Sequence, residues 1–225
     1  MKSQCAINRI QGFTWVELLV VIGVLALVAA LLLPALAAAK HKSARINCVN
    51  GLKQINIAFR MWEGDNGDKY PMQFALTNSE TMKLLANGNA YVIWQTISNE
   101  ISTPKILHCP DDKQRTNAVS FSQGFSDSNI SYFLSLSLDA VESYPQMILD
   151  GDDNLAVDGV RVKPGILNLW TNNITWTKER HGGSGNIGLA DGSVQQTISA
   201  GLSSAIASST SGVPTNNAPI RWVIP

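Results

Sequence analysis

Charged side chains are scarce in this sequence. Only 15% of its 225 residues are Asp, Glu, Lys or Arg, and 17 basic residues balance 17 acidic ones. A chain without net positive charge offers no general attraction for nucleic acid, which argues against DNA or RNA as a partner. Part of the shortage is local, because no charged residue lies between Leu18 and Ala39.

Cysteine is also rare. The three cysteines are Cys5, Cys48 and Cys109, and none is in a C-x-x-C spacing, so zinc-finger and thioredoxin-like motifs are disfavoured. If the first twelve residues are removed, two cysteines remain, an even number suited to an oxidising compartment. A disulfide between Cys48 and Cys109 is one hypothesis. Two unpaired thiols are the alternative, because the sequence places neither residue in space.

The longest apolar run covers residues 13–39 and is interrupted only by Glu17 and Pro34. It can cross a hydrocarbon core of about 30 Å, which takes a helix of about 20 residues. An ordinary signal peptide has a shorter run, with its cleavage site after it. Here a short polar segment, residues 1–12, precedes the run instead.

Beyond Lys40 the apolar residues recur every three or four positions, as on one face of an amphipathic helix. They are Ile46, Val49, Leu52, Ile55, Phe59 and Trp62. We therefore expect one helix from about Phe13 to Trp62, ended by the Gly and Asp residues that follow. Residues 13–39 are its transmembrane half and residues 40–63 its amphipathic half.

Residues 64–198 contain short strand candidates separated by loops rich in Ser, Asn, Asp and Gly. The candidates are 91–94, 105–109, 130–136, 165–170 and 186–196. One long helix followed by strands predicts an α+β fold, with the helix packed on a small antiparallel sheet. Residues 199–225 form a Ser/Ala-rich segment whose end, IRWVIP, is compatible with an edge strand.

The segment from Gly12 to Glu17, followed by the apolar run, resembles the processing site of type IV prepilins and type II secretion pseudopilins. The resemblance implies that a prepilin peptidase cuts between Gly12 and Phe13 and that Phe13 becomes N-methylated. Glycine suits a tight protease cleft because it has no side chain. The alternative for Gly12 is a plain turn before a helix.

Two residues inside the apolar run are assembly candidates. An acid in a membrane segment costs about 2.5–3.5 kcal/mol at the helix centre, so Glu17 is a functional candidate. Its expected partner is the α-amine of Phe13 on a neighbouring subunit, and the alternative is a position at headgroup depth. Pro34 should kink or loosen the helix, or it marks the end of the membrane span.

The resemblance implies an inner-membrane, single-pass protein with a cytoplasmic N-terminus before cleavage. Its C-terminal domain would be periplasmic or displayed on an extracellular or envelope-spanning filament. The expected partners are the chain itself, other pilin-like subunits, the peptidase and an inner-membrane assembly platform. The positive-inside rule alone favours the opposite orientation, because residues 1–12 hold two basic residues and residues 40–53 hold four. We give the processing motif precedence, because it requires a cytoplasmic leader.

Two further segments resemble a large subgroup of pilin-like proteins. His181, followed after nine residues by Asp191 and Gly192, is similar to its His-x9-Asp-Gly element, and Cys109-Pro110-Asp111-Asp112 to its Cys-Pro-x-Asp. A histidine with an aspartate can do acid–base work, but no nucleophile is recognisable beside them. The alternative, which we favour, is structural: His181 forms hydrogen bonds with polar groups of a buried loop, and Asp191-Gly192 forms the turn of a hairpin.

Asp150, Asp152 and Asn154, with Asp158 nearby, place oxygen ligands at alternate positions. Such ligands suit calcium, and some pseudopilins bind calcium in a C-terminal loop. Leu155 and Arg161 stand where an EF-hand needs glycine and a carboxylate, so this is no EF-hand. Calcium is the one cofactor that we consider, and the alternative is a solvated turn.

The sequence therefore predicts a structural, non-enzymatic subunit of a type II secretion pseudopilus or type IV pilus-like filament. The rival is an envelope enzyme or ligand-binding module that uses its single span only as an anchor. A convergent pocket of titratable groups with shifted pKa values would favour the rival.

Overall fold

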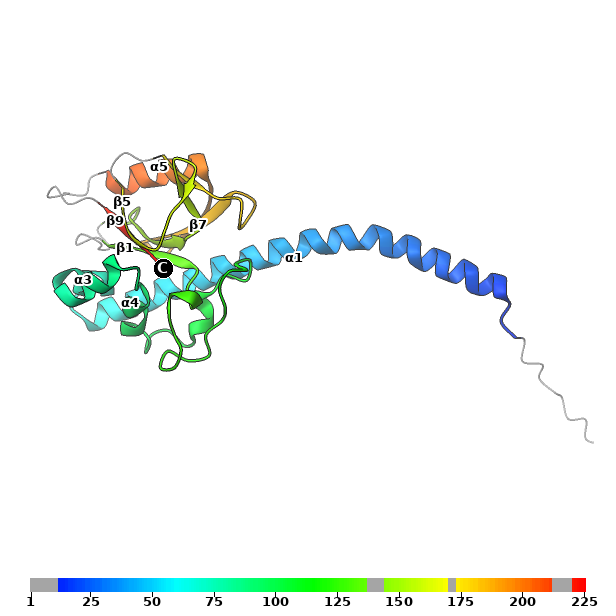
Figure 1. Cartoon of the computed structure of the whole chain (residues 1–225), viewed down its shortest axis with the longest axis horizontal. Coiled ribbons are helices and arrows are strands. Elements are labelled where there is room, and N and C mark those ends of the chain that lie inside the picture. The colour runs from blue at the N-terminus through cyan, green and yellow to red at the C-terminus, as the bar shows by residue number, and fades with distance from the viewer. Residues whose placement is uncertain (1–11, 137–143, 170–172, 212–219) are drawn as a thin grey trace, which may run out of the picture. The chain divides into compact units, whose positions relative to one another are not determined.

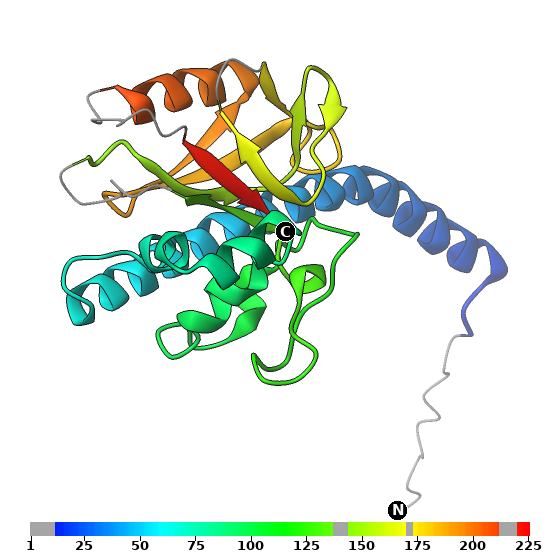
Figure 2. The same cartoon turned by 60° about the vertical axis from the view of Figure 1, so that its left-hand side comes forward.

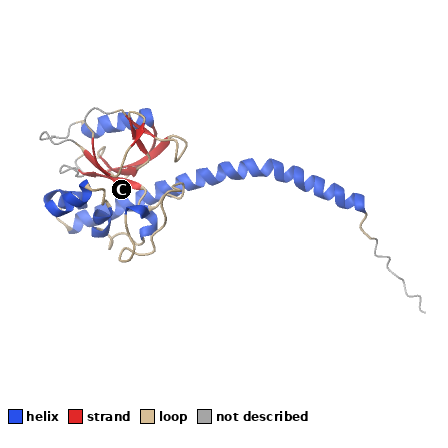
Figure 3. Ribbon diagram, viewed as in Figure 1, coloured by secondary structure: helices blue, strands red, loops and turns tan. Residues whose placement is uncertain are grey.

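The computed structural model describes residues 12–136, 144–169, 173–211 and 220–225. The chain divides into two compact units, Met1–Lys42 and Ser43–Pro225, and helix α1 (Trp15–Asp65) contributes to both. The elements after α1 are the helices α2 (Pro71–Thr77), α3 (Ser79–Ala86), α4 (Tyr91–Thr96) and α5 (Ser199–Thr210), the 3-10 helices η1 (Pro104–Leu107) and η2 (Asp127–Asn129), and the strands β1 (Tyr132–Leu136), β2 (Ile148–Asp152), β3 (Leu155–Val157), β4 (Val160–Arg161), β5 (Gly165–Asn168), β6 (Ile174–Trp176), β7 (Ser184–Leu189), β8 (Val194–Ile198) and β9 (Arg221–Ile224). This is the α+β fold that the sequence predicts (Figure 3).

Helix α1 confirms the predicted long helix closely. It ends at Asp65, where Gly67 adopts a left-handed φ of 67° that helical residues do not share. Pro34 lies inside α1, and the helix continues past it. The predicted leader falls largely on residues 1–11, which lie outside the described residues.

The amphipathic half of α1 buries most of its predicted face. Leu52, Ile55 and Phe59 have no exposed surface, whereas Ile46 is 47% exposed and lies outside the buried face. Gly51 belongs to this face as well. A Cβ there would lie 2.9 Å from the carbonyl oxygen of Ile106, so only glycine lets the helix backbone come so close to this loop.

The domain is built around a six-stranded antiparallel sheet with the order β5-β9-β1-β2-β7-β8. Helix α5 covers one face, and the second part of α1, with α3 and α4, lies on the other (Figures 1 and 2). Each face carries its own hydrophobic core. In the core on the α5 side, the rings of Phe133 and Trp222 stack with centroids 4.1 Å apart. A smaller sheet has the order β4-β3-β6.

The predicted β7–β8 hairpin is present, but its loop differs in detail. Gly188 pairs with Val194, and the Leu189 N–H donates to the Ser193 carbonyl, so the loop has three residues, whereas the Asp191-Gly192 pair taken alone predicts a two-residue loop. Gly192 is the left-handed residue of this loop, with φ 83°. This is the usual geometry of a three-residue hairpin, a turn closed by a left-handed glycine.

Several predictions from the sequence were wrong. Residues 91–94 form part of helix α4, and residues 105–109 fall in η1 and the turn after it. A short apolar run cannot by itself distinguish a strand from a buried helix turn. The Ser/Ala-rich segment contains helix α5, which was not predicted. Strand β9 is not an edge strand, because it lies between β5 and β1. Residue 170 of the 165–170 candidate and residues 212–219 lie outside the described residues.

Candidate functional site

The predicted processing site lies just before α1. Gly12 and Phe13 are exposed, and 71% of the Phe13 surface is accessible. A Cβ on Gly12 would meet no atom within 4 Å, so the fold itself does not require glycine at this position. Any requirement for glycine here would have to come from outside the folded chain, for instance from a protease cleft.

Glu17 has a partner within its own chain. Its Oε2 accepts hydrogen bonds from the backbone N–H and the hydroxyl of Thr14, each 2.8 Å long, and its own N–H donates to the Thr14 hydroxyl oxygen at 3.2 Å. This reciprocal pattern is a capping box, which satisfies donors at the start of a helix. The signal, Thr-x-x-Glu before an apolar run, is visible in the sequence but was overlooked.

The first part of α1 is long and apolar enough to cross a membrane, and the most apolar window of the helix has no buried residue. Its large side chains are exposed, for example Leu31 at 71% and Leu36 at 68%. Apolar surface of this extent marks a membrane or protein contact. Among the described residues of α1, this confirms the predicted single span at the level of length and composition.

A disulfide joins Cys48 on α1 to Cys109, two residues beyond η1. The Cα atoms are 5.2 Å apart, and neither residue has exposed surface. The hypothesis of a Cys48–Cys109 disulfide is therefore confirmed. The bond ties the amphipathic half of α1 to the loops of the domain across 61 residues of sequence.

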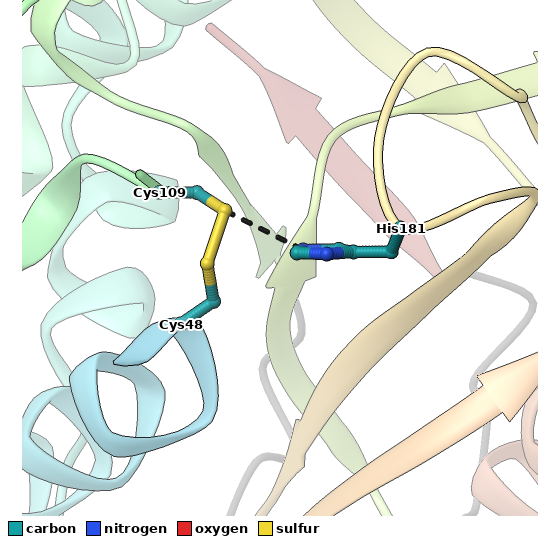
Figure 4. A group of neighbouring side chains, drawn as sticks. All are labelled: Cys48, Cys109 and His181. Atoms are coloured by element: carbon teal, nitrogen blue, oxygen red, sulfur yellow. Dashed lines mark hydrogen bonds between the residues drawn. A yellow bond between two sulfur atoms is a disulfide. The ribbon is translucent and has the colours of Figure 1, made fainter. Parts of the chain in front are cut away.

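His181 sits beside this disulfide, in the turn between β6 and β7 (Figure 4). Its backbone is left-handed, with φ 52°, and Gly182 and Gly183 continue the turn with φ 65° and 84°. Asp111 holds this conformation, because its Oδ2 accepts the His181 N–H at 2.9 Å and lies 3.3 Å from Nδ1. A histidine in this backbone region is uncommon and persists only where its surroundings stabilise it.

The other imidazole nitrogen of His181 faces sulfur and oxygen. Nε2 is 3.4 Å from the Cys109 Sγ and 3.5 Å from the Asp152 Oδ2. Only 1% of the side chain is exposed, and burial lowers the pKa of His181 against the opposing influence of Asp152 and Asp111. The Cys-Pro-x-Asp segment and His181 are therefore neighbours in space, a contact that sequence reasoning did not foresee.

Asp191 and Gly192, the other half of the subgroup element, serve the β7–β8 turn. The Asp191 Oδ1 accepts the Ser193 N–H at 2.8 Å. The turn also contacts α1, because Arg60 donates to the Ala190 carbonyl at 2.9 Å. These contacts agree with the structural interpretation of Asp191 and Gly192.

A buried network of charges lies next to His181. Arg180 pairs with Asp112 at 3.3 Å and with Asp153, and Arg115 pairs with the same two carboxylates. Burial opposes ionisation of Asp112, but Arg180 and a hydrogen bond from Ser131 outweigh it and lower the pKa of Asp112. A buried charge needs such partners to remain ionised. Sequence reasoning missed this network, since nothing in the spacing pairs Arg180 with Asp112, 68 positions earlier, or with Asp153, 27 positions earlier.

The four calcium candidates are not gathered into one loop. Asp150 and Asp152 lie on β2 and Asn154 follows it, all fully buried, whereas Asp158 is exposed in the turn beyond β3. The Asn154 amide donates to two carbonyls, and the Asp152 Oδ2 accepts from the N–H and side chain of Asn186 at 2.7 and 2.8 Å. Calcium binding stays a prediction that rests on spacing alone.

Two of these carboxylates are strongly affected by burial. Desolvation raises the pKa of Asp150 well above its ordinary value and also raises that of Asp152, which Arg180 partly offsets. A Cβ at Gly188 would lie 1.9 Å from the Asp150 carboxylate and 2.6 Å from the Asn56 amide, so glycine is required for this close approach. Asp150 thereby brings a carboxyl group from the sheet to Asn56 on α1.

Whether His181 and the charged groups around it could act on a substrate depends on whether a substrate can reach them. Titratable groups with shifted pKa values do converge at His181, as the rival interpretation expects. These groups are buried, however. Among the described residues, one surface pocket of about 440 Å³ is lined by two members of the charge network, Arg115 and Asp153. Since the His181 side chain is 1% exposed, a substrate cannot reach it without displacing neighbouring loops.

No protein-family model, curated protein or solved structure matches this chain.

Proposed function

We propose that this chain is a filament subunit of the pilin or pseudopilin kind, made as a precursor and cut between Gly12 and Phe13. The observation that carries the proposal is the division of α1. Its first part exposes apolar side chains, whereas its second part is a structural element of the domain. A subunit that polymerises through its N-terminal helix needs both properties in one helix.

Glu17 supports the proposal because it is the only acid between Phe13 and Ala39 and lies in the first turn of α1. In a filament its carboxylate would meet the Phe13 amine of a neighbouring subunit, and each charge would neutralise the other. The capping box offers a second role inside the subunit. The two roles make opposite predictions and are therefore separable.

The test uses three variants in a host that carries the assembly machinery. Glu17→Gln keeps the cap, since glutamine also completes a capping box, but removes the charge. Thr14→Ala keeps the charge but removes the hydroxyl that takes part in two of the three hydrogen bonds of the cap, and Glu17→Ala removes the charge together with both bonds to Oε2. The measurement is the ratio of mature subunit in sheared filaments to mature subunit in the membrane.

If Glu17 pairs across subunits, Glu17→Gln and Glu17→Ala should lower the ratio at least tenfold, while Thr14→Ala stays near wild type. If only the cap matters, Thr14→Ala and Glu17→Ala should fail and Glu17→Gln should assemble. Normal assembly of all three variants would contradict both roles of Glu17. Absence of the wild-type chain from the sheared filaments would contradict the filament proposal and favour the anchored module.

A further inference from the structure

Two further side chains of metal-binding types, His181 and Asp152, lie beside the Cys48–Cys109 disulfide. The two sulfur atoms and the His181 Nε2 lie within 4.8 Å of one another. The Asp152 carboxylate adjoins them, with its Oδ2 3.5 Å from Nε2. Three segments remote in sequence, α1, the loop between η1 and η2, and the β6–β7 turn, thus bring sulfur and imidazole ligands to one point (Figure 4).

The spacing of these atoms suits a tetrahedral metal ion. Zinc binds thiolate at about 2.3 Å and imidazole or carboxylate at about 2.0–2.2 Å, which places neighbouring ligand atoms about 3.3–3.8 Å apart. Two separations at this site, 3.4 Å from the Cys109 Sγ to Nε2 and 3.5 Å from Nε2 to the Asp152 Oδ2, fall in this range. Breaking the S–S bond lets the sulfurs separate to a similar distance.

The orientation of His181 is that of a ligand. The Asp111 Oδ2 lies 3.3 Å from Nδ1 and can accept its proton, and in this tautomer the Nε2 lone pair faces the sulfurs. A carboxylate behind a histidine in this way is the usual outer support of a metal-bound imidazole. The left-handed backbone of His181, held by the same Asp111 oxygen, fixes the ring in place.

Asp152 supplies a second, independent observation. It has no exposed surface, and its Oδ1 is buried without a hydrogen-bond partner among the described residues. The carboxylate therefore has acceptor capacity that its described neighbours do not use, and Oδ2, 3.5 Å from Nε2, is the oxygen that we assign to the site. Asn186 fixes the other oxygen through its N–H and its side chain.

We propose that the reduced chain binds one Zn²⁺ through Cys48, Cys109, His181 and Asp152, so that zinc and the disulfide are alternative links between α1 and the domain. Reduction by a dithiol transfers two electrons and two protons to the S–S bond and leaves the reductant as a disulfide. Zinc then displaces the two thiol protons. Oxidation by a disulfide reverses the exchange: it joins the two sulfurs, releases Zn²⁺ and, with two protons taken up from water, leaves two thiols on the oxidant.

The consequence is a link that holds under both redox conditions. Two thiolates, one imidazole and one carboxylate in a closed, buried site are a structural zinc set, and the soft sulfur ligands select against calcium and magnesium. Wherever a reductant keeps the two cysteines as thiols, zinc would hold the helix in the place where the disulfide otherwise holds it.

The experiment uses the full chain with Cys5→Ser, purified in detergent without oxygen and reduced by a phosphine, which competes weakly for zinc. Zn²⁺ stoichiometry is measured by equilibrium dialysis, and Co²⁺ serves as an optical probe. The reduced protein should bind one ion per chain and show thiolate-to-cobalt charge transfer. The oxidised protein should show neither. Absence of charge transfer in the folded, reduced protein, or equal binding by both forms, would overturn the proposal.

Variants then assign the ligands. In the reduced protein, His181→Gln and Asp152→Asn should each weaken zinc binding at least tenfold, whereas His41→Gln, a histidine elsewhere on α1, should leave it unchanged. Asp111→Asn acts through His181 and should weaken binding about 10- to 100-fold without changing the stoichiometry. Unchanged affinity in His181→Gln would contradict the assignment.

A measurement on the unsubstituted ligands covers the case in which these variants fail to fold. Zinc should raise the Tm of the reduced wild-type domain and leave that of the oxidised domain unchanged, because only the reduced native state has the site. No shift in the reduced protein would overturn the proposal irrespective of the variants.

Discussion

The two halves of α1 differ in a way that composition alone would not suggest. The first half is the more apolar, yet its side chains are exposed, as at Leu31 and Leu36. The second half carries charged residues, yet Leu52 and Phe59 on it are fully buried. Burial inside this chain therefore follows the spacing of apolar residues on one helix face and not their number. Apolar surface left over in the first half calls for a lipid or protein environment.

The largest effect that we expect comes from blocking the proposed cleavage between Gly12 and Phe13, at the start of the apolar half. Gly12→Val should abolish the mature form, because glycine has no side chain and a branched side chain would not fit a tight protease cleft at the proposed cleavage site. Intact mass of membrane-extracted wild type should show loss of residues 1–12, with or without one methyl on Phe13.

Gly23→Val is the matched control, because Gly23 also has no neighbouring atom within 4 Å but lies inside the apolar run. It should be processed normally. Wild-type protein that begins at Met1, or that is cut after residues 37–39, would contradict the proposed site.

The contrast between the halves should also appear in stability. Phe59 packs against Trp94 and Tyr70, with ring centroids 5.9 and 6.5 Å away. Phe59→Ala should lower the free energy of unfolding of the domain by about 3–5 kcal/mol. Leu31→Ala removes a large side chain from the exposed half and should change it by less than about 0.5 kcal/mol. Denaturation of both variants in detergent, followed by tryptophan fluorescence, checks this, and equal losses would refute the contrast.

The disulfide should contribute less to the free energy of unfolding than Phe59 does. Replacing Cys48 and Cys109 together by Ala should lower the free energy of unfolding by about 2–4 kcal/mol, because the closed loop is long. The same denaturation experiment in the absence of reductant and metal measures it. Cys5→Ala is the control and should have no effect. A double variant as stable as wild type would mean that packing alone holds α1 on the domain.

The smallest effect concerns pH. Burial raises the pKa of Asp127 from 3.8 to about 6, although its carboxylate accepts the Tyr91 N–H at 2.9 Å. The folded chain then holds this proton more tightly than the unfolded chain, so the contribution of Asp127 to stability is complete below about pH 4 and is lost as the pH rises through about 6. After allowance for solvent screening, the loss is about 1–2 kcal/mol.

Asp127→Asn keeps the acceptor and cannot ionise, so the variant should lack this loss and be the more stable form at pH 7. The measurement is the free energy of unfolding at pH 4, 5, 6 and 7 for wild type and variant, with Asp65→Asn, an exposed aspartate, as the control. Parallel curves for wild type and Asp127→Asn would contradict the assignment.

Local patterns in the sequence predicted the local parts of this fold. The stripe on α1 and the β7–β8 hairpin were predictable because helix periodicity and an Asp-Gly turn are properties of neighbouring residues. Residues 91–94 were misassigned because four apolar residues fit a strand and a helix turn equally well. The position of β9 was unpredictable, because its partners β5 and β1 are remote in the sequence and chosen by the whole sheet.

The candidate sites divide in the same way. The capping box of Thr14 and Glu17 spans three positions and could have been found. His181 and Cys109 meet across 72 positions, and the sequence gives no distance between them. Arg180 was overlooked for the same reason, since its carboxylate partners reach it only after the β6–β7 turn docks.

The central position of β9 sets an order of events during biosynthesis. Residues 221–224 are made after all the other strands of this sheet, and until they emerge β5 and β1 lack the strand that joins them. The apolar part of α1, in contrast, is made before any of these strands. The helix is thus available for membrane insertion well before the six-stranded sheet can form, and completion of the sheet must wait for β9. During that interval, the exposed edges of β5 and β1 are the part of the molecule most in need of a chaperone.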